Sequence, residues 1–180
     1  MIISPAMAPS EPPPSAAGLS PSPPRSIADV AAAGVATWFG AGLLPWAPGT
    51  WGSLAALPFA WGLCVMSDGP LPLALATAGV ALLGWISADH HARRIGEADP
   101  GQVVVDEVAG QWLTLVAVPP DILAYAAGFL LFRLFDIWKP WPAGWADRTL
   151  KGGLGIMVDD IVAGAYAGLV LHGLLLWRGS

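Results

Sequence analysis

The sequence predicts an all-α protein, a membrane-associated helical bundle with two transmembrane helices and short apolar hairpin helices. Only 12% of its 180 residues are charged and 55% are hydrophobic, whereas soluble domains contain about 25% charged residues. Residues 69–88 form an uncharged run of 20 residues, about the length that crosses the hydrocarbon core of a bilayer. The ten tryptophans are also typical of a protein at a membrane interface.

The N-terminal segment, residues 1–27, is expected to be disordered. It is rich in proline and serine, carries two charges and has no apolar run, so it cannot bury enough surface to offset the entropy of ordering. It also lacks the apolar region of roughly 7–15 residues that a signal peptide needs. A single helical membrane domain is therefore expected over residues 28–180, with Ser26 and Asp29 as candidate N-caps of its first helix.

The uncharged stretch of residues 30–67 contains the segment TWFGAGLLPWAPGTWGSLAALP. Its prolines and glycines predict a loop, and Thr50 or Ser53 is a candidate cap for the helix that follows. A helix that begins after P-G-T is suited to bind an anion, because its free N–H groups point outward. On this stretch alone, the favoured interpretation is a capped apolar helix without a ligand.

A first group of acids lies in DPGQVVVDEVAGQW, residues 99–112. Asp106 and Glu107 follow an apolar run and are costly to bury without a cation, so a bound partner is expected. The alternative is an acid pair at the N-terminus of an ordinary amphipathic helix. Gly110, four residues after Asp106, leaves room on that face for another helix to approach.

The remaining apolar segments complete the predicted bundle. Residues 108–132 are broken at Pro119-Pro120-Asp121 into arms of 11 to 13 residues, which predicts a helical hairpin rather than two full crossings. Residues 161–177 form the second predicted transmembrane helix. Residues 89–160 lie between the two predicted spans and contain six of the eight Lys and Arg residues, which places this region on the cytoplasmic side.

A second group of charges occupies FRLFDIWKPWPAGWADRTLKGGLGIMVDDIVAG, residues 132–164. Arg133, Asp136 and Lys139 are three residues apart and would share one face of a helix, which Pro140 would end. An ordinary surface ion pair between Arg133 and Asp136 is the alternative to a functional role.

The second half of this segment adds a glycine-rich turn and another acid pair. The glycines at 152, 153 and 155 would let backbone N–H groups turn toward a ligand beside Lys151. Asp159 and Asp160 are expected to open the next apolar helix, where negative charge complements the helix dipole. Carboxylates, cations and a glycine-rich turn together indicate a phosphate held by a divalent cation.

Several classes of function are excluded by composition. The net charge of −5 and the absence of a basic patch argue against a nucleic-acid partner. Cys64 is the single cysteine, so neither an intramolecular disulfide nor a cysteine zinc cluster is possible. The adjacent His90 and His91 would diverge by about 100° on a helix and are not counted as a metal site. The oligomeric state is not determined by the sequence.

The polar segments resemble the phosphatidylglycerophosphatase A family of Mg²⁺-dependent lipid phosphatases. The resemblance implies a largely helical enzyme of the bacterial inner membrane, with its active site facing the cytoplasm. It implies hydrolysis of a phospholipid, phosphatidylglycerophosphate, to phosphatidylglycerol and inorganic phosphate. The matching segments occur in the family's order, and the proline-rich N-terminus lies outside the family pattern. These segments are ATWFGAGLLPWAPGTWGS (36–53), DEVAGQW (106–112), FRLFDIWKPWP (132–142) and KGGLGIMVDDIVAGAYA (151–167).

Other phosphatase classes do not fit the residues. Cysteine phosphatases need C-x5-R, but the sixth residue after Cys64 is Pro70. The D-x-D-x-[TV], P-S-G-H and D-x2-D-G-x2-A-R patterns of other phosphate enzymes are also missing. Metal-assisted hydrolysis remains, with Mg²⁺ as the cofactor, because this hard cation prefers oxygen ligands.

The candidate site residues fall into two groups. Asp106, Asp136 and Asp160 are the preferred metal ligands, since neighbours in each acid pair point about 100° apart on a helix. The alternative to the enzyme is a non-catalytic membrane protein that binds a divalent ion or an anionic lipid headgroup. Five clustered acids favour the enzyme, because they repel phosphate unless a metal intervenes. The candidate metal ligands are Asp106, Glu107, Asp136, Asp159 and Asp160, of which all but Asp159 are also candidate catalytic residues, and the candidate phosphate-binding residues are Arg133, Lys139, Lys151, Thr50 and Ser53.

Overall fold

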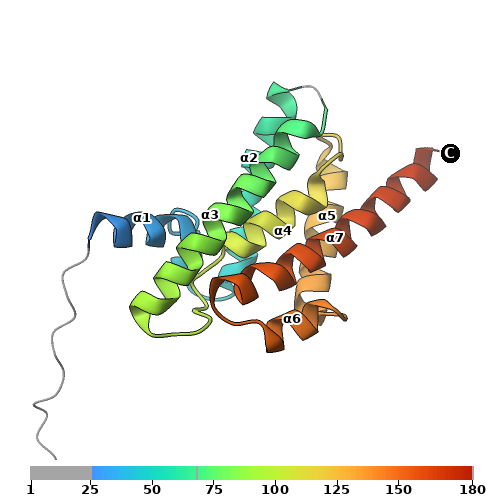
Figure 1. The fold of residues 1–180 in the computed structure, drawn as a ribbon. Coiled ribbons are helices and arrows are strands. Elements are labelled where there is room, and N and C mark those ends of the chain that lie inside the picture. The colour runs from blue at the N-terminus through green and yellow to red at the C-terminus, as the bar shows by residue number, and fades with distance from the viewer. Residues whose placement is uncertain (1–25, 68, 180) are drawn as a thin grey trace, which may run out of the picture.

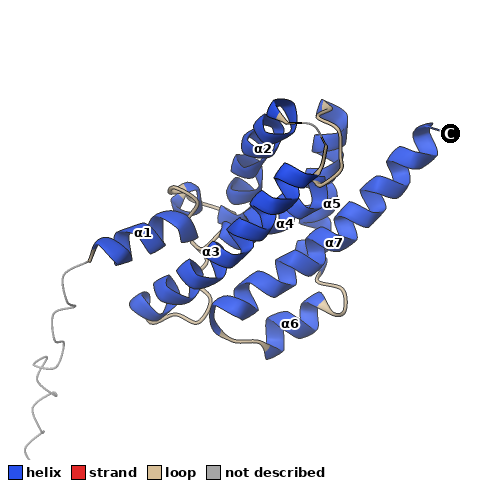
Figure 2. Cartoon of the chain, turned by 45° about the horizontal axis from the view of Figure 1, so that its top comes forward, coloured by secondary structure: helices blue, strands red, loops and turns tan. Residues whose placement is uncertain are grey.

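The computed structural model describes residues 26–67 and 69–179, and over these residues the chain forms helices and loops without strands (Figures 1 and 2). This confirms the predicted all-α class. The predicted disordered segment lies outside the described residues, apart from its last two positions. The elements in order are α1 (Ile27–Ala36), the 3₁₀ turn η1 (Ala41–Leu43), α2 (Pro48–Met66), α3 (Leu71–Ile95), α4 (Val105–Leu115), α5 (Ile122–Trp138), α6 (Ala143–Thr149) and α7 (Gly152–Gly179).

The short helix α4 lies at the centre of the bundle. Nine of its eleven residues are buried, and α2, α3, α5 and α7 all pack against it (Figure 1). The indole N–H of Trp112 donates a hydrogen bond of 2.8 Å to the carbonyl of Ala56 and ties α4 to α2. At a rise of about 1.5 Å per residue, α4 is far too short to cross a membrane. It is instead an enclosed helix, and Asp106 and Glu107 lie in its first turn.

Helix α7 crosses α4 at a point of very close approach. A Cβ atom placed on Gly110 would lie 2.6 Å from the carbonyl oxygen of Asp160 and 2.5 Å from the ring of Phe132. A Cβ atom on Gly164 would meet the carbonyl of Gly110. The hydroxyl of Thr114 lies 2.9 Å from the Gly110 carbonyl oxygen and 3.3 Å from that of Gly164, and donates to both. The approach predicted at Gly110 is confirmed, and it sets Asp160 beside α4.

Three helices are long and apolar enough to cross a membrane, namely Pro48–Met66, Leu71–Ile95 and Gly152–Arg178. Helix α3 contains residues 71–88 of the first predicted transmembrane segment, 69–88, and α7 contains the second, 161–177. The third, α2, is an addition to the prediction. Large apolar side chains are exposed along these helices, as expected for surfaces in contact with lipid; on α3 and α7 they include Leu75, Leu82, Leu83, Leu169, Leu174 and Leu176.

The helix starts match the prediction at α1 and differ at α2. Ser26 caps α1, since its hydroxyl accepts the N–H of Asp29 at 3.1 Å while the Asp29 carboxylate accepts the N–H of Ser26 at 2.7 Å. The predicted caps Thr50 and Ser53 were wrong. Helix α2 begins at Pro48, after Ala47 in a left-handed conformation without a side-chain cap. Proline suits a first helical turn because it needs no N–H partner there.

The ends of α5 and α7 also required correction. Helix α5 ends before Pro140, as predicted, but Lys139 is its C-cap with a φ of 47° and does not continue the helical face of Arg133 and Asp136. Helix α7 begins at Gly152, so the glycine-rich segment is its first turn rather than a loop. The two acids at 159 and 160 therefore lie inside α7, about two turns from its start.

Substituting Gly110 tests the close crossing of α4 and α7. We expect Gly110→Ala to lower the free energy of unfolding by about 1–3 kcal/mol, as overpacking does in a dense core, and to lower activity by displacing Asp160. Thermal unfolding in detergent measures the first effect. Gly79→Ala is the control, because a Cβ at this position in α3 meets nothing within 4 Å. Equal stability of the two variants would contradict the packing argument.

Candidate active site

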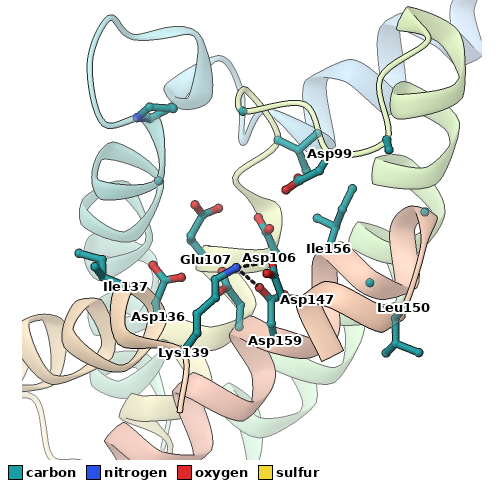
Figure 3. A pocket seen from close by; sticks show the side chains of 18 of the residues that line it. Asp99, Asp106, Glu107, Asp136, Ile137, Lys139, Asp147, Leu150, Ile156 and Asp159 are labelled. Atoms are coloured by element: carbon teal, nitrogen blue, oxygen red, sulfur yellow. Dashed lines mark hydrogen bonds and ion pairs between the residues drawn. The ribbon is translucent and has the colours of Figure 1, made fainter. Parts of the chain in front are cut away.

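A cavity of about 430 Å³ lies where the start of α2, the start of α4, the end of α5 and the first turns of α7 meet (Figure 3). All the charged residues predicted for the site line this cavity, although they come from three separate segments of the sequence. Thr50 and Ser53 do not line it. The predicted residues that line the cavity are Asp106, Glu107, Arg133, Asp136, Lys139, Lys151, Asp159 and Asp160.

Three of the predicted metal ligands converge inside the cavity. Asp106, Glu107 and Asp160 each offer one carboxylate oxygen, and these three oxygens all lie within 4.8 Å of one another. Asp106 Oδ1 and Glu107 Oε2 are buried and have no hydrogen-bond partner among the described residues. Buried carboxylate oxygens without donors are suited to a hard cation such as Mg²⁺. We call these three residues the acid triad.

The electrostatics of α4 favour the binding of a cation at the triad. Burial, followed by the neighbouring charge of Glu107, raises the pKa of Asp106 well above its usual range. Burial also raises the pKa of Glu107, and the Asp136 carboxylate adds to this effect, whereas the Asp106 carboxyl group and the charge of Arg133 oppose it. Like charges at close range in a poorly solvated site favour protonation unless a cation compensates them.

The two other predicted metal ligands are paired with cations. Asp136 Oδ2 lies 2.5 Å from Arg133 Nη1, and Asp159 Oδ2 accepts a hydrogen bond of 2.6 Å from Lys139 Nζ. Lys139 Nζ also donates to Asp147 Oδ1 at 2.5 Å, and Figure 3 shows it between the two carboxylates. Asp147 was not predicted as a site residue, because the turn that separates it from Lys139 breaks any helical periodicity.

The expected divergence of adjacent acids is seen at one pair only. In α7, Asp160 joins the triad while Asp159 contacts Lys139. In α4, Asp106 and Glu107 both join the triad. The cavity lies at the N-terminal end of α4, so side chains from neighbouring faces of its first turn reach the same space.

Gly49 is a site residue that sequence reasoning did not single out. A Cβ atom on Gly49 would collide with Glu107 Oε1 and would lie 3.2 Å from Arg133 Nη1. The first turn of α2 thus packs its backbone directly on these two side chains. The P-G-T pattern is the available signal, but by itself it predicts a loop followed by a helix with a hydroxyl cap. Ser53, one turn further on, is buried and donates to the carbonyl of Gly49 at 2.8 Å.

The cations of the site differ in how they are held. Burial lowers the pKa of Lys139, but its hydrogen bonds to Asp147 and Asp159 outweigh that effect and hold the pKa above its usual value, so Lys139 is protonated. Arg133 Nε is buried without a hydrogen-bond partner among the described residues. Lys151 is exposed at the border of the cavity.

The glycine-rich segment is not free to bind a ligand in the way the sequence suggested. The N–H of Gly153 donates to Asp89 Oδ1 at 3.2 Å. A Cβ atom on Gly153 would lie 2.7 Å from the Asp89 Cβ and would meet the carbonyl of Trp85. These glycines allow α7 to begin against α3, and this packing brings Lys151 to the edge of the cavity.

Comparison with known proteins identifies the family. The family model described as phosphatidylglycerophosphatase A matches residues 34–175, a range that includes every residue of the acid triad and its neighbouring cations. The chain belongs to the phosphatidylglycerophosphatase A family. The predicted resemblance is therefore confirmed, and membership makes the chain a phosphatase, a phosphoric monoester hydrolase. The alternative of a non-catalytic binding protein is set aside.

Three curated relatives illustrate the range of this similarity. A phosphatidylglycerophosphatase A of Escherichia coli is 44% identical over 139 residues, covering 77% of this chain and 80% of the relative. Another from Haemophilus influenzae is 39% identical over 145 residues, covering 79% and 88%. A Bacteroides thetaiotaomicron protein, provisionally named phosphatidylinositol-3-phosphatase, is 38% identical over 144 residues, covering 76% and 89%. No solved structure matches the chain.

The contact between Gly49 and the acid triad can be tested by adding one methyl group. We expect Gly49→Ala to reduce phosphatase activity by about tenfold or more, because the methyl group would displace the Glu107 carboxylate and positioning errors of this kind are costly. Gly62→Ala is the matched control in the same helix, since its Cβ meets nothing within 4 Å. Activity assays and thermal unfolding of both variants measure the effect. Wild-type activity in Gly49→Ala would show that the close packing is not needed.

Proposed function

We propose that the chain is a Mg²⁺-dependent lipid phosphatase that hydrolyses phosphatidylglycerophosphate to phosphatidylglycerol and inorganic phosphate. The observation that carries this proposal is the acid triad beside two cations inside a predominantly apolar helical protein. Two buried oxygens of the triad have no hydrogen-bond partner in the part of the chain that the structure describes. Two of the three relatives carry the name phosphatidylglycerophosphatase A. The name of the third relative specifies a different lipid, but it describes the same type of reaction, removal of a phosphate monoester from a lipid headgroup.

In this proposal, Asp106, Glu107 and Asp160 hold the cation. Mg²⁺ prefers oxygen ligands and binds proteins through a few carboxylates together with substrate phosphates, so these three residues would hold it against the substrate phosphate. When bound, the cation would neutralise charge on the phosphate and lower the pKa of the attacking water. Asp136 and Asp159 act mainly by orienting Arg133 and Lys139.

The residues of the chain then have distinct roles in hydrolysis. Arg133 and Lys139 bind phosphate oxygens, and the arginine is the better partner because it presents parallel N–H donors. A carboxylate of the site accepts the proton of the attacking water. The water oxygen bonds to phosphorus, the phosphorus–oxygen bond to the lipid glycerol breaks, and the released alcohol oxygen takes up a proton.

We propose that the site faces the cytoplasm at the bacterial inner membrane. Residues 89–160 contain six of the eight Lys and Arg residues, and such residues are enriched on the cytoplasmic side of membrane proteins. The end of α3 and the start of α7 meet near the cavity through the hydrogen bond between Asp89 and Gly153. The polar end of α3 and the polar start of α7 therefore lie on the same side of the protein as the site.

Phosphate release tests the proposed activity directly. The purified protein should release inorganic phosphate from phosphatidylglycerophosphate vesicles, should stop when the divalent cations are chelated, and should recover when Mg²⁺ is restored. Vesicles that contain phosphatidylinositol 3-phosphate, assayed in parallel, compare the two lipid classes. Absence of Mg²⁺-dependent release from phosphatidylglycerophosphate would overturn the assignment.

Removing one charge of the acid triad should raise the metal requirement. For Glu107→Gln we expect the Mg²⁺ concentration at half-maximal rate to rise by about tenfold, which corresponds to roughly 1.4 kcal/mol of binding free energy. The control is Asp99→Asn, because Asp99 is an exposed acid that lines the cavity but is not in the triad. Rates measured across a Mg²⁺ titration compare the two. An equal shift in both variants would argue for a general charge effect instead of metal binding.

Replacing the arginine tests the phosphate-binding role. Arg133→Lys keeps the charge but loses the parallel donors, and we expect kcat/KM to fall by about 10–100-fold, in keeping with roughly 1.5–3 kcal/mol for a hydrogen bond to a charged group. The Mg²⁺ concentration at half-maximal rate should change little. If Arg133 serves only to pair with Asp136, the lysine variant should match wild type in steady-state kinetics.

A further inference from the structure

An apolar groove of about 560 Å³ lies between α2 and α5, outside the polar cavity. Its lining is apolar and aromatic and comes from these two helices alone. The volume falls in the range of sites that hold small ligands, about 300–1,000 Å³. The residues that define its walls include Leu57, Pro58, Trp61, Tyr125, Ala126 and Phe129.

Along the axes of α2 and α5, the groove begins within two helical turns of the polar cavity. Helix α2 starts at the cavity with Gly49 and reaches the groove at Leu54, about 8 Å further along its axis. On α5, Arg133 lines the cavity. Leu130, one turn earlier and about 5 Å away along the helix axis, lines the groove. Asp136 and Ile137, on the last turn of α5, lie on the side of the cavity where α2 runs (Figure 3).

The walls of the groove are held by contacts inside the bundle. Trp61 and Tyr125 meet edge to face, with ring centroids 5.0 Å apart and an interplanar angle of 72°, which joins the two helices across the groove. The hydrogen bond from Trp112 to Ala56 holds α2 on α4. The small exposed side chain of Ala126 leaves space between larger neighbours. The groove is therefore a concave feature of a packed structure.

We propose that this groove holds an acyl chain of the lipid whose phosphate occupies the polar cavity, an inference that rests on the proposed function. A phosphorylated lipid carries an anionic headgroup and long apolar chains in one molecule. The structure presents the matching order, with cations and the acid triad in the cavity and an apolar groove that starts within two helical turns of them. A phosphate monoester without acyl chains would leave the groove unoccupied.

The test fills the groove and compares two substrates. Ala126→Trp places a large ring in the groove, and Ala78→Trp makes the same change at an exposed alanine of α3 that does not line it. The substrates are diacyl phosphatidylglycerophosphate in mixed micelles and its deacylated, water-soluble headgroup. We expect Ala126→Trp to raise KM for the diacyl substrate by about tenfold and to leave kcat/KM for the headgroup within about twofold, because only the apolar contact is lost. Ala78→Trp should change neither.

A crosslinking measurement on the unmodified protein guards against a variant that fails to fold. The probe is phosphatidylglycerol with a photoreactive diazirine in one acyl chain. We expect it to label peptides of α2 and α5 in preference to α3, and excess diacyl phosphatidylglycerol to reduce this labelling while the deacylated headgroup does not.

The other outcomes overturn either the inference or the proposed function on which it rests. Equal labelling of α3 and α5, or identical kinetics of the two tryptophan variants, would show ordinary boundary lipid. Dissociation of an oligomer by Ala126→Trp without a change in KM would assign the groove to a second copy of the chain. Absence of Mg²⁺-dependent release from both substrates by the wild-type protein would instead refute the proposed function.

Discussion

The close packing of α7 on α4 is the constraint on which the site depends. Gly110 and Gly164 let the two backbones approach until a methyl group at either glycine would overlap the opposite helix. This approach brings Asp160 from α7 to the first turn of α4, where Asp106 and Glu107 lie. Small residues at helix contacts serve the same purpose in other membrane proteins, where van der Waals packing replaces the hydrophobic effect as the driving force.

Charge balance explains how so many ionised groups occupy a mostly apolar protein. Arg133 and Lys139 each contact a carboxylate, and Lys139 contacts two. These pairs give Asp136, Asp147 and Asp159 fixed cations, although Asp159 Oδ1 is buried without a hydrogen-bond partner among the described residues. Among the described residues no ion pair joins the acid triad to a cation, although the charge of Arg133 acts on Glu107. This difference separates the carboxylates that orient cations from those suited to hold a metal. Buried charges that lack compensation are costly, so the uncompensated set indicates function.

The positions of the helices connect the polar site to the apolar exterior. Helices α2, α3 and α7 are candidate membrane spans, and α2 and α7 contribute their first turns to the cavity while α3 supports the start of α7 through Asp89. Helices α2 and α5 also form the walls of the apolar groove. A lipid phosphate and the chain attached to it can therefore contact neighbouring parts of the same two helices.

The sequence by itself determined the all-α class, both predicted spans, the helix break at residues 119–121, the family and eight of the ten charged residues that line the cavity, Asp99 and Asp147 being the exceptions. Apolar run lengths, prolines and isolated charges are local signals, which is why the sequence is enough for them. The tertiary structure alone decided which acids converge. Spacing along one helix predicted a role for Asp136 equal to that of Asp160, yet Arg133 pairs with Asp136 while α7 carries Asp160 to the triad. It also showed Gly49 against Glu107 and placed Lys139 at a helix end between two acids. These contacts join segments far apart in the chain, and their geometry follows from how closely the helices pack.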